Sequence, residues 1–487
     1  MKKLNVVIDF FCMGLALLLC AYAVVDEKNY KLLVLSAVLF CVGNMIYALP
    51  KFKERSYFFF FHLTFFFFLL GRPLITVLQG ENLEKITHLK YSQNANIWLG
   101  IVLILVALIG SRIGAMLGNL FNKKVFCSKK KTITASESFW LFNLKWISLM
   151  LFCIAVIASM ILEGEKVAFI IEHSYVSYYV SFKSRLPYVI YVISTFMEPA
   201  LCCFLITYPS KKQAYVVLGL YIATTVLSLI GGERNPFVLA VLFALIYFIY
   251  RDYIGDKKKW IGKIETIGML VATPIGLIFL SLMNYIRDGV SSGMSKVTEI
   301  LVDLLYKQGV TFSWYCSGLG VLKQLPGINT SNYTFGGFID YFKYGSIGQV
   351  CLGIEGLGSG NSIRHAMNGN SMAHQLSYTL LGDSYLQGHG CGSCYLLEVY
   401  ADYGIVGIFI FSILLGAILT SALAIARKNT ICGVIMLLSI TGTLFMPRAE
   451  AMGGVNFILR IPFWCTFAVC MIGSSLFTRK YKRRFEK

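Results

Sequence analysis

Residues 368–416 read NGNSMAHQLSYTLLGDSYLQGHGCGSCYLLEVYADYGIVGIFIFSILLG, a polar, glycine-rich stretch that runs directly into a long apolar segment. The first half ends a loop that begins near residue 287. The second half has the length and composition of a membrane span. Because similar apolar segments recur on both sides, we predict an all-α polytopic membrane protein with one large loop containing short amphipathic helices.

The composition supports this class. The chain has 487 residues, of which 57% are hydrophobic and 14% are charged, and its mean hydropathy is +0.68. Soluble domains carry about 25% charged residues. The apolar segments are continuous rather than alternating, which excludes a membrane β-barrel. About twelve transmembrane helices are expected, at residues 4–25, 31–49, 57–79, 95–120, 139–162, 187–208, 214–231, 236–250, 266–286, 394–425, 431–447 and 454–476.

The net charge of +19 is unevenly distributed. More than half of the 44 lysines and arginines lie at the two termini and in every second short connection. Short basic connections stay in the cytoplasm. We therefore predict that both termini are cytoplasmic and that the long loop is extracytoplasmic. This distribution also argues against a nucleic-acid partner, because no basic stripe with interleaved aromatics is present.

Four regions follow from this topology. We predict an N-terminal bundle of about nine spans at 1–286, the extracytoplasmic loop at 287–393, C-terminal membrane helices at 394–476 and a basic tail at 477–487. The outer side has no carboxylate-rich cluster, so we predict neither a metal site nor a cofactor.

Two parts of the loop have recognisable patterns. Residues 294–307 place apolar side chains at helical spacing, which predicts an amphipathic helix lying on the membrane surface. Residues 333–344 are rich in aromatics and glycine. They could stack on sugar rings or lie at the membrane interface, and the sequence leaves both interpretations open.

Arginines on the predicted outer side run against the charge bias and therefore need partners. One interpretation is structural ion pairs with neighbouring acidic residues. The other is a pocket for a lipid diphosphate, because the guanidinium fork matches phosphate and never loses its charge. The predicted diphosphate ligands are Arg234, Arg287, Arg364 and Arg448, and Arg72 at the outer end of the third span could join them.

His374 is the predicted general base, since a neutral imidazole can accept a proton near pH 7. It shares a helical face with Tyr378. The alternative is that His374 belongs to a buried polar network. Glu398, at the head of the span after the loop, is the second candidate base. The residues expected to shape the sugar site are Asn235, Tyr378, Gly390 and Tyr400.

Residues 390–407 match the pattern G-x-G-S-x4-E-x-Y-x-[DN]-[FY]-G-x-x-G, and residues 232–236 match G-x-R-x-P. With the many spans and one large loop, these motifs resemble Wzy-type polymerases of O-antigen and capsular polysaccharide. The loop departs from the pattern in having Cys391 and Cys394 where small residues would be unsurprising.

The resemblance implies a metal-independent glycosyltransferase of the GT-C class in the bacterial cytoplasmic membrane. Its substrates would be oligosaccharide repeat units on undecaprenyl diphosphate, and its partners would be membrane lipid, a chain-length regulator and a flippase. An O-antigen ligase-like transferase and a polysaccharide flippase or transporter remain as alternatives. A transporter would need ionisable groups at mid-membrane and paired halves.

Overall fold

The computed structural model describes residues 2–26, 29–86, 94–126, 135–173, 177–178, 181–256, 259–288, 297–358 and 360–485. Over these ranges the chain is helical or irregular and contains no β-strand. Among these described residues, eleven helical stretches are long and apolar enough to cross a membrane. The predicted class, an all-α polytopic membrane protein, is therefore confirmed.

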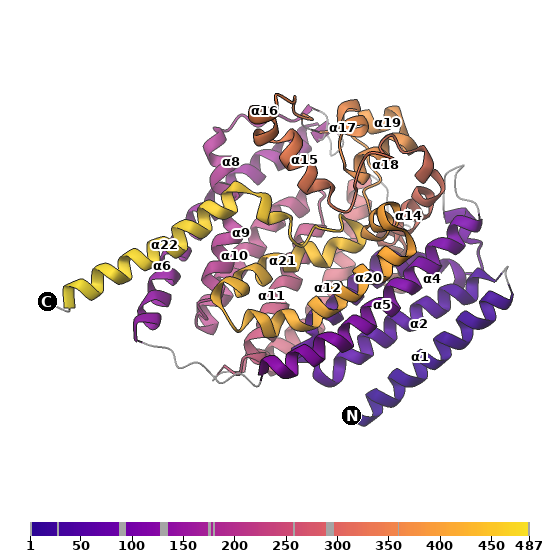
Figure 1. Cartoon of the computed structure of the whole chain (residues 1–487), viewed down its shortest axis with the longest axis horizontal. Helices are drawn as coiled ribbons and strands as arrows, with labels where there is room; N and C mark the ends of the chain where they lie inside the picture. Colours follow the sequence, from indigo (N-terminus) through magenta and orange to yellow (C-terminus); the bar gives the residue numbers. More distant parts are fainter. Residues whose placement is uncertain are drawn as a thin grey trace. The chain divides into compact units, whose positions relative to one another are not determined.

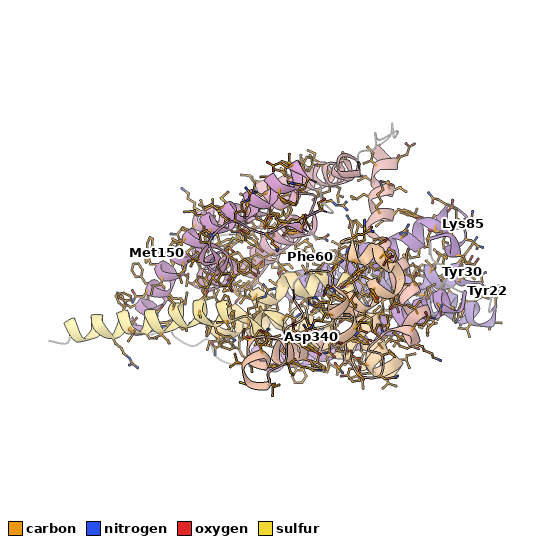
Figure 2. All side chains as sticks on the ribbon, turned by 90° about the horizontal axis from the view of Figure 1, so that it is seen from above. Tyr22, Tyr30, Phe60, Lys85, Met150 and Asp340 are labelled. Carbon is orange, nitrogen blue, oxygen red and sulfur yellow. The ribbon has the colours of Figure 1, made fainter. Side chains whose placement is uncertain are left out.

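One of the eleven stretches supplies two predicted spans. It covers Tyr30–Leu78, 49 residues, which at about 1.5 Å per residue is too long for a single crossing. The chain folds back at Leu49–Lys51, so that α4 packs against α2. Tyr30 donates a hydrogen bond to Asn82, just beyond α4, and Tyr30 and Lys85 lie at the same end in Figure 2. The hairpin consists of α2 (Tyr30–Ala48), α3 (Phe52–Phe65), a π-helical turn (Phe66–Leu70) and α4 (Gly71–Leu78).

The last span begins later than predicted. Residues 454–460 form turns and a short 3-10 helix (Asn456–Leu459), and α22 runs over Ile461–Phe485. Pro462 is the second residue of α22, a position where its missing N–H is not needed by the helix. The two glycines at 453 and 454 favour the preceding turns.

The chain divides into two compact units, and each combines segments from distant parts of the sequence. Unit 1 comprises Met1–Phe121, Lys263–Ser421 and Thr443–Gly453; unit 2 comprises Asn122–Gly262, Ala422–Gly442 and Gly454–Lys487. The long loop therefore belongs to one unit with the spans on either side of it. Figure 1 labels most of the helices of both units.

Unit 1 contains α1 (Lys2–Val25), the hairpin of α2 to α4, α5 (Asn94–Phe126), α12 (Lys263–Asp288), the loop helices and α20 (Tyr395–Ala426). The loop helices are α13 (Val297–Gln308), α14 (Val310–Val321), α15 (Gly336–Tyr344), α16 (Ser346–Leu352), α17 (Ile363–Asn368), α18 (Met372–Leu381) and α19 (Asp383–Leu386). In Figure 1, α17, α18 and α19 gather near α14 at one end of this unit.

Unit 2 is organised around α6 (Ala135–Glu172), which packs against four other helices of the unit. Lys166 on α6 forms an ion pair with Glu233 at 2.9 Å. Glu163, on the same helix, accepts a hydrogen bond from Ser228 at 2.7 Å. The other described helices of this unit are α8 (Tyr188–Ser194), α9 (Met197–Leu205), α10 (Lys211–Ile230), α11 (Asn235–Tyr253), α22 and α21 (Thr430–Phe445), whose last three residues belong to unit 1.

A glycine stripe on α5 brings its backbone against α20. A Cβ atom at Gly114 would lie 1.9 Å from the carbonyl oxygen of Ile413, and one at Gly118 would lie 2.2 Å from Thr420 Oγ1. On α20, a Cβ atom at Gly416 would lie 2.0 Å from the carbonyl oxygen of Ser111. Small residues at four-residue spacing allow membrane helices to approach this closely. The glycines therefore fix α20, and with it the end of the loop, against the N-terminal helices.

The amphipathic helix predicted at 294–307 is present as α13, and α4 covers part of its apolar face. Leu304 is buried, and the side chain of Leu305 packs so closely on Gly71 of α4 that a Cβ atom there would lie 2.4 Å from it. The location of α13 at the membrane surface stays a prediction, because apolar spacing alone does not say whether lipid or another helix covers the rest of the face. Residues 294–296 lie outside the described residues.

Gly114→Ala is expected to lower the unfolding temperature in detergent, because the added methyl group would push α5 away from α20. Overpacking of this kind costs about 1–3 kcal/mol. Gly219→Ala on α10 is the matched control, since nothing lies within 4 Å of its Cβ position. Thermal unfolding followed by size-exclusion chromatography measures both variants. An unchanged midpoint for Gly114→Ala would contradict the close contact.

Candidate active site

Two arginines of unit 1 approach the same turn, where α13 ends at Gln308 and α14 begins after Gly309. Arg448 lies in a 3-10 turn (Met446–Arg448) and donates from Nη1 to the carbonyl oxygen of Gln308 at 3.4 Å. Arg72, on α4, donates from Nη1 to Ser313 Oγ at 3.1 Å. A Cβ atom at Gly309 would lie 2.5 Å from Arg72 Cβ, so only glycine permits this approach.

The Arg72 side chain is almost enclosed. It is 7% exposed, and its guanidinium carbon lies 4.4 Å from the centre of the Tyr306 ring. Its Nε has no hydrogen-bond partner among the described residues. A buried donor without a partner is unfavourable by about 1–3 kcal/mol. Arg72 therefore retains unused capacity to bind an anion at the turn between α13 and α14.

Glu398 connects the head of α20 to the turn that carries Arg448. Its side chain is 1% exposed. One carboxyl oxygen accepts from Ser393 Oγ at 2.6 Å and the other from the backbone N–H of Ala451 at 2.7 Å. Both oxygens are thus engaged within the protein. This geometry suits a residue that holds the Arg448 turn in place.

His374 lies in a separate polar group built from α17, α18 and α19. Its ring stacks on that of His365 with centroids 4.5 Å apart and planes at 10°. Its Nδ1 lies 2.8 Å from the hydroxyl of Tyr385, which also accepts from the backbone N–H of Ser362 at 3.2 Å. Burial, assisted by the charge of His365, lowers the pKa of His374 from 6.5 to about 4. His374 is therefore neutral at pH 7.

A buried amide holds the loop together around this group. Gln375 is fully buried and accepts from the backbone N–H of Gly327 at 2.9 Å and from the Tyr333 hydroxyl at 2.7 Å. Its amide donates to the carbonyl oxygen of Gly369 at 2.7 Å and to Ser331 Oγ at 3.1 Å. All four hydrogen-bonding positions of the amide are therefore used.

Two carboxylates extend this network. Asp340 accepts from the backbone and side-chain nitrogens of Asn370 at 2.8–3.0 Å, and burial raises the pKa of Asp340. Asp402 accepts from the backbone N–H groups of Tyr333 and Thr334 at 3.1 and 2.6 Å. The sequence analysis missed Asp340 and Gln375. The one sequence signal for Gln375 was its position as an uncharged amide directly after the candidate base, His374.

The other predicted site residues are dispersed. Arg364 forms an ion pair with Glu355 at 2.7 Å, and that glutamate side chain is 82% exposed. Arg234 and Asn235 belong to unit 2, where Arg234 occupies the N-cap position of α11 without a side-chain capping hydrogen bond. The side chain of Arg287 lies outside the described residues.

The predicted sugar-site residues of unit 1 lie on different elements. Tyr378 meets Tyr385 edge to face, with ring centroids 5.9 Å apart. Tyr400 is half-buried on α20, and Gly390 is exposed next to Ser377. The cysteines beside them are free thiols, and burial raises the pKa values of Cys391 and Cys394 to about 12.

The fold and these polar groups define a multi-pass membrane protein in which Arg72 and Arg448 meet at one turn, the cationic turn between α13 and α14, in the same unit as a loop held together by hydrogen bonds. The family model of the O-antigen polysaccharide polymerase Wzy matches residues 7–481. The chain therefore belongs to this family of polysaccharide polymerases, which act on lipid-linked oligosaccharide repeat units in the membrane. No curated protein and no solved structure matches the chain.

Lowering the pH from about 7.5 to 5 is expected to destabilise the protein partly through His374. Between the folded pKa of about 4 and the ordinary value of 6.5, only the unfolded chain binds the proton. This contribution to stability is full above pH 6.5 and is lost as the pH falls towards 4. His374→Gln should therefore lose less thermal stability than the wild type over this pH change.

The matched control is His389→Gln, since His389 is exposed. Its loss of thermal stability on acidification should equal that of the wild type. If His374→Gln also loses as much as the wild type, the imidazole of His374 is not held neutral by burial.

Proposed function

We propose that this chain joins oligosaccharide repeat units carried on a polyprenyl diphosphate, at the outer face of the bacterial cytoplasmic membrane. The growing chain on one lipid carrier is the donor, and a hydroxyl of the new lipid-linked unit is the acceptor. Both termini are cytoplasmic in this proposal, as the distribution of basic residues predicts. Membership of the polymerase family and the enclosed cationic turn support it.

In the proposed reaction, the acceptor oxygen forms a bond to the anomeric carbon of the donor. The bond from that carbon to the diphosphate oxygen breaks, and the lipid diphosphate leaves with the electron pair. The acceptor proton passes to a base. This reaction needs cationic groups where negative charge develops on the leaving group and a proton acceptor near the hydroxyl.

Arg72 and Arg448 are the proposed diphosphate ligands. The observation that carries this assignment is that both guanidinium groups reach the turn between α13 and α14, one from each side of the loop in sequence. Arg72 Nε is a buried donor with no partner in the described chain. A diphosphate would supply the acceptor oxygens that such donors need.

Glu398 is proposed as a positioning residue and His374 as the general base. The carboxyl oxygens of Glu398 already accept from Ser393 and Ala451, which leaves them poorly placed to accept a substrate proton. His374 is neutral, and in the tautomer in which Nδ1 donates to Tyr385 and Tyr385 donates to the carbonyl oxygen of Ser362, it would receive the proton on Nε2. Because its pKa of about 4 lies below the working pH, its basicity in the free protein is low.

The other arginines that were predicted to bind the diphosphate have different proposed roles. Arg364 is proposed to stabilise the loop through Glu355 rather than to bind substrate. Arg234 and Arg287 remain proposed diphosphate ligands on the basis of their positions in the sequence.

We also propose that the reaction needs no divalent metal, because guanidinium groups supply the cationic charge. Activity should therefore persist in excess EDTA.

Arg72→Lys and Arg448→Lys should each lower the rate of polymerisation, because lysine keeps the charge but loses the fork. A lost charge-assisted hydrogen bond is worth about 1.5–3 kcal/mol, which corresponds to roughly ten- to a hundredfold in rate. The assay uses purified protein in liposomes with a defined polyprenyl-diphosphate-linked repeat unit. Product length is read on a gel.

Two variants make this test specific. Arg479→Lys on the exposed part of α22 is the matched control and should behave as wild type. Arg364→Lys should also retain most activity, since its partner Glu355 is at the surface. If the lysine variants at 72 and 448 fold normally and polymerise at the wild-type rate, the proposed ligand set is wrong. Products that carry a single added unit would instead indicate a ligase-like transferase.

A further inference from the structure

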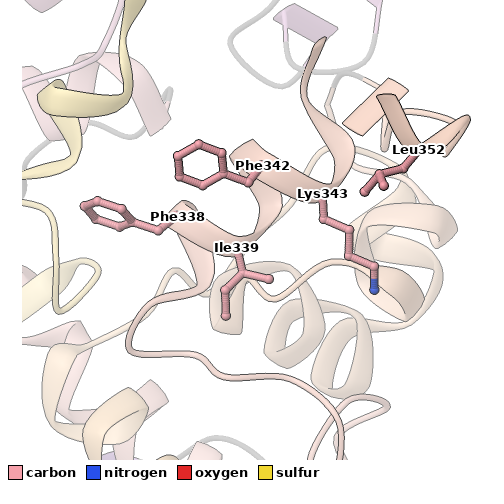
Figure 3. A pocket seen from close by; sticks show the side chains of 5 residues that line it. All are labelled: Phe338, Ile339, Phe342, Lys343 and Leu352. Atoms are coloured by element: carbon pink, nitrogen blue, oxygen red, sulfur yellow. The ribbon is translucent and has the colours of Figure 1, made fainter. Parts of the chain in front are cut away.

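The hairpin formed by α15 and α16 exposes an apolar face on the loop. Phe342 is 52% exposed, Val350 is 84% exposed and Leu352 is 65% exposed. Between the two helices lies a shallow groove lined by Phe338, Ile339, Phe342, Lys343 and Leu352. Figure 3 shows Phe338 and Phe342 projecting to the same side of α15, with Leu352 contributed by α16. Because α15 and α16, with 9 and 7 residues, are too short to cross a membrane, exposed apolar side chains on them indicate a binding surface.

The opposite side of the hairpin is firmly attached to the loop. Gly336 lies so close to Asn370 that a Cβ atom would be 2.3 Å from the carbonyl oxygen of Asn370. Asp340 accepts hydrogen bonds from Asn370, and the Tyr344 hydroxyl donates to the carbonyl oxygen of Asn368 at 2.8 Å. The apolar face is therefore presented in a fixed orientation.

The level of the membrane surface follows from α20. This helix is interrupted at Gly404, whose φ of 62° breaks the helical path. Beyond it, residues 405–426 measure about 33 Å at 1.5 Å per residue, which matches the roughly 30 Å hydrocarbon core. An exposed apolar stripe runs along this part through Val406, Ile410, Leu414 and Ile418. The loop-side boundary of the hydrocarbon core therefore lies near Gly404.

The hairpin begins at this same level. Tyr403, next to the interruption, accepts a hydrogen bond from Asn332 Nδ2 at 2.9 Å. The side-chain oxygen of Asn332 in turn accepts from the backbone N–H of Phe335 at 2.9 Å, directly before α15. Between Asn332 and Phe335, the backbone N–H groups of Tyr333 and Thr334 donate to the carboxylate of Asp402. The hairpin therefore starts from the loop-side end of the lipid-facing part of α20.

We propose that the α15–α16 hairpin docks into the membrane leaflet on the loop side and that its groove holds the acyl chain of a phospholipid. The side chains of Phe342, Val350 and Leu352 enter the leaflet, where burial of apolar surface drives interfacial binding. Residues 335–354 carry two charged side chains. Asp340 is engaged by Asn370, so exposed Lys343 is left to meet a lipid phosphate. This inference requires only that the protein spans the membrane.

The test places the photoreactive residue p-benzoylphenylalanine at position 342 or 350 in the full chain. The protein is reconstituted in nanodiscs of phosphatidylethanolamine and phosphatidylglycerol and irradiated, and adducts are identified by intact-mass spectrometry. Position 384, exposed on α19 away from the hairpin, is the matched control. We expect phospholipid adducts at 342 and 350 and none above background at 384.

Absence of phospholipid adducts at 342 and 350 in folded, monodisperse protein would overturn the proposal. A second arm adds a polyprenyl diphosphate as a minor component of the nanodisc. If the groove serves bulk lipid, adducts should follow the lipid composition. Adducts that contain mostly the minor polyprenyl lipid would overturn the assignment and make the groove part of the substrate site. Because no polymerisation is measured, failure of the proposed function would leave this result unaffected.

Discussion

The two hydrogen bonds accepted by the Glu398 carboxyl group determine where Arg448 lies. They join Ser393, at the end of the long loop, to Ala451, in the turn before the last span. Since the group is 1% exposed, loss of either partner would leave a buried carboxyl oxygen unsatisfied, which is strongly unfavourable. Glycines on α5 hold the remainder of α20 against the N-terminal helices. The cationic turn therefore depends on contacts that are distant from it in sequence.

The features that were predicted well from the sequence are those that depend on the length of local apolar segments. The membrane class and the positions of the spans follow from segment length and composition, because hydrocarbon imposes the same demand on every crossing. The last span was placed too early because residues 454–460 form turns and a short 3-10 helix instead of the first turns of α22. The sequence analysis identified Glu398 as a candidate base. A carboxyl group at the head of a span could equally well be a positioning residue that holds a neighbouring turn in place. The bonds from Ser393 and Ala451 favour the positioning role that we propose.

The side-chain partners could not be predicted, since polar contacts between distant residues leave no periodic pattern. Nothing in the sequence distinguishes Arg364 from the other candidate arginines, yet in the structure it forms an ion pair with Glu355. Arg72 was a secondary candidate, and its approach to Ser313 depends on the glycine at 309. Likewise, α13 and the α15–α16 hairpin both carry apolar side chains, but α4 covers the first and leaves the second exposed. Tertiary packing decides which apolar face meets lipid.

The central claim is that Arg72 and Arg448 together bind the diphosphate of a lipid-linked substrate. A cryo-electron microscopy structure of the protein in nanodiscs with a polyprenyl diphosphate tests it most directly. We expect phosphate oxygens at the turn between α13 and α14, within hydrogen-bond distance of Arg72 Nε and of the Arg448 guanidinium. A bound diphosphate that engages neither arginine, for example one held at Arg364, would contradict the account.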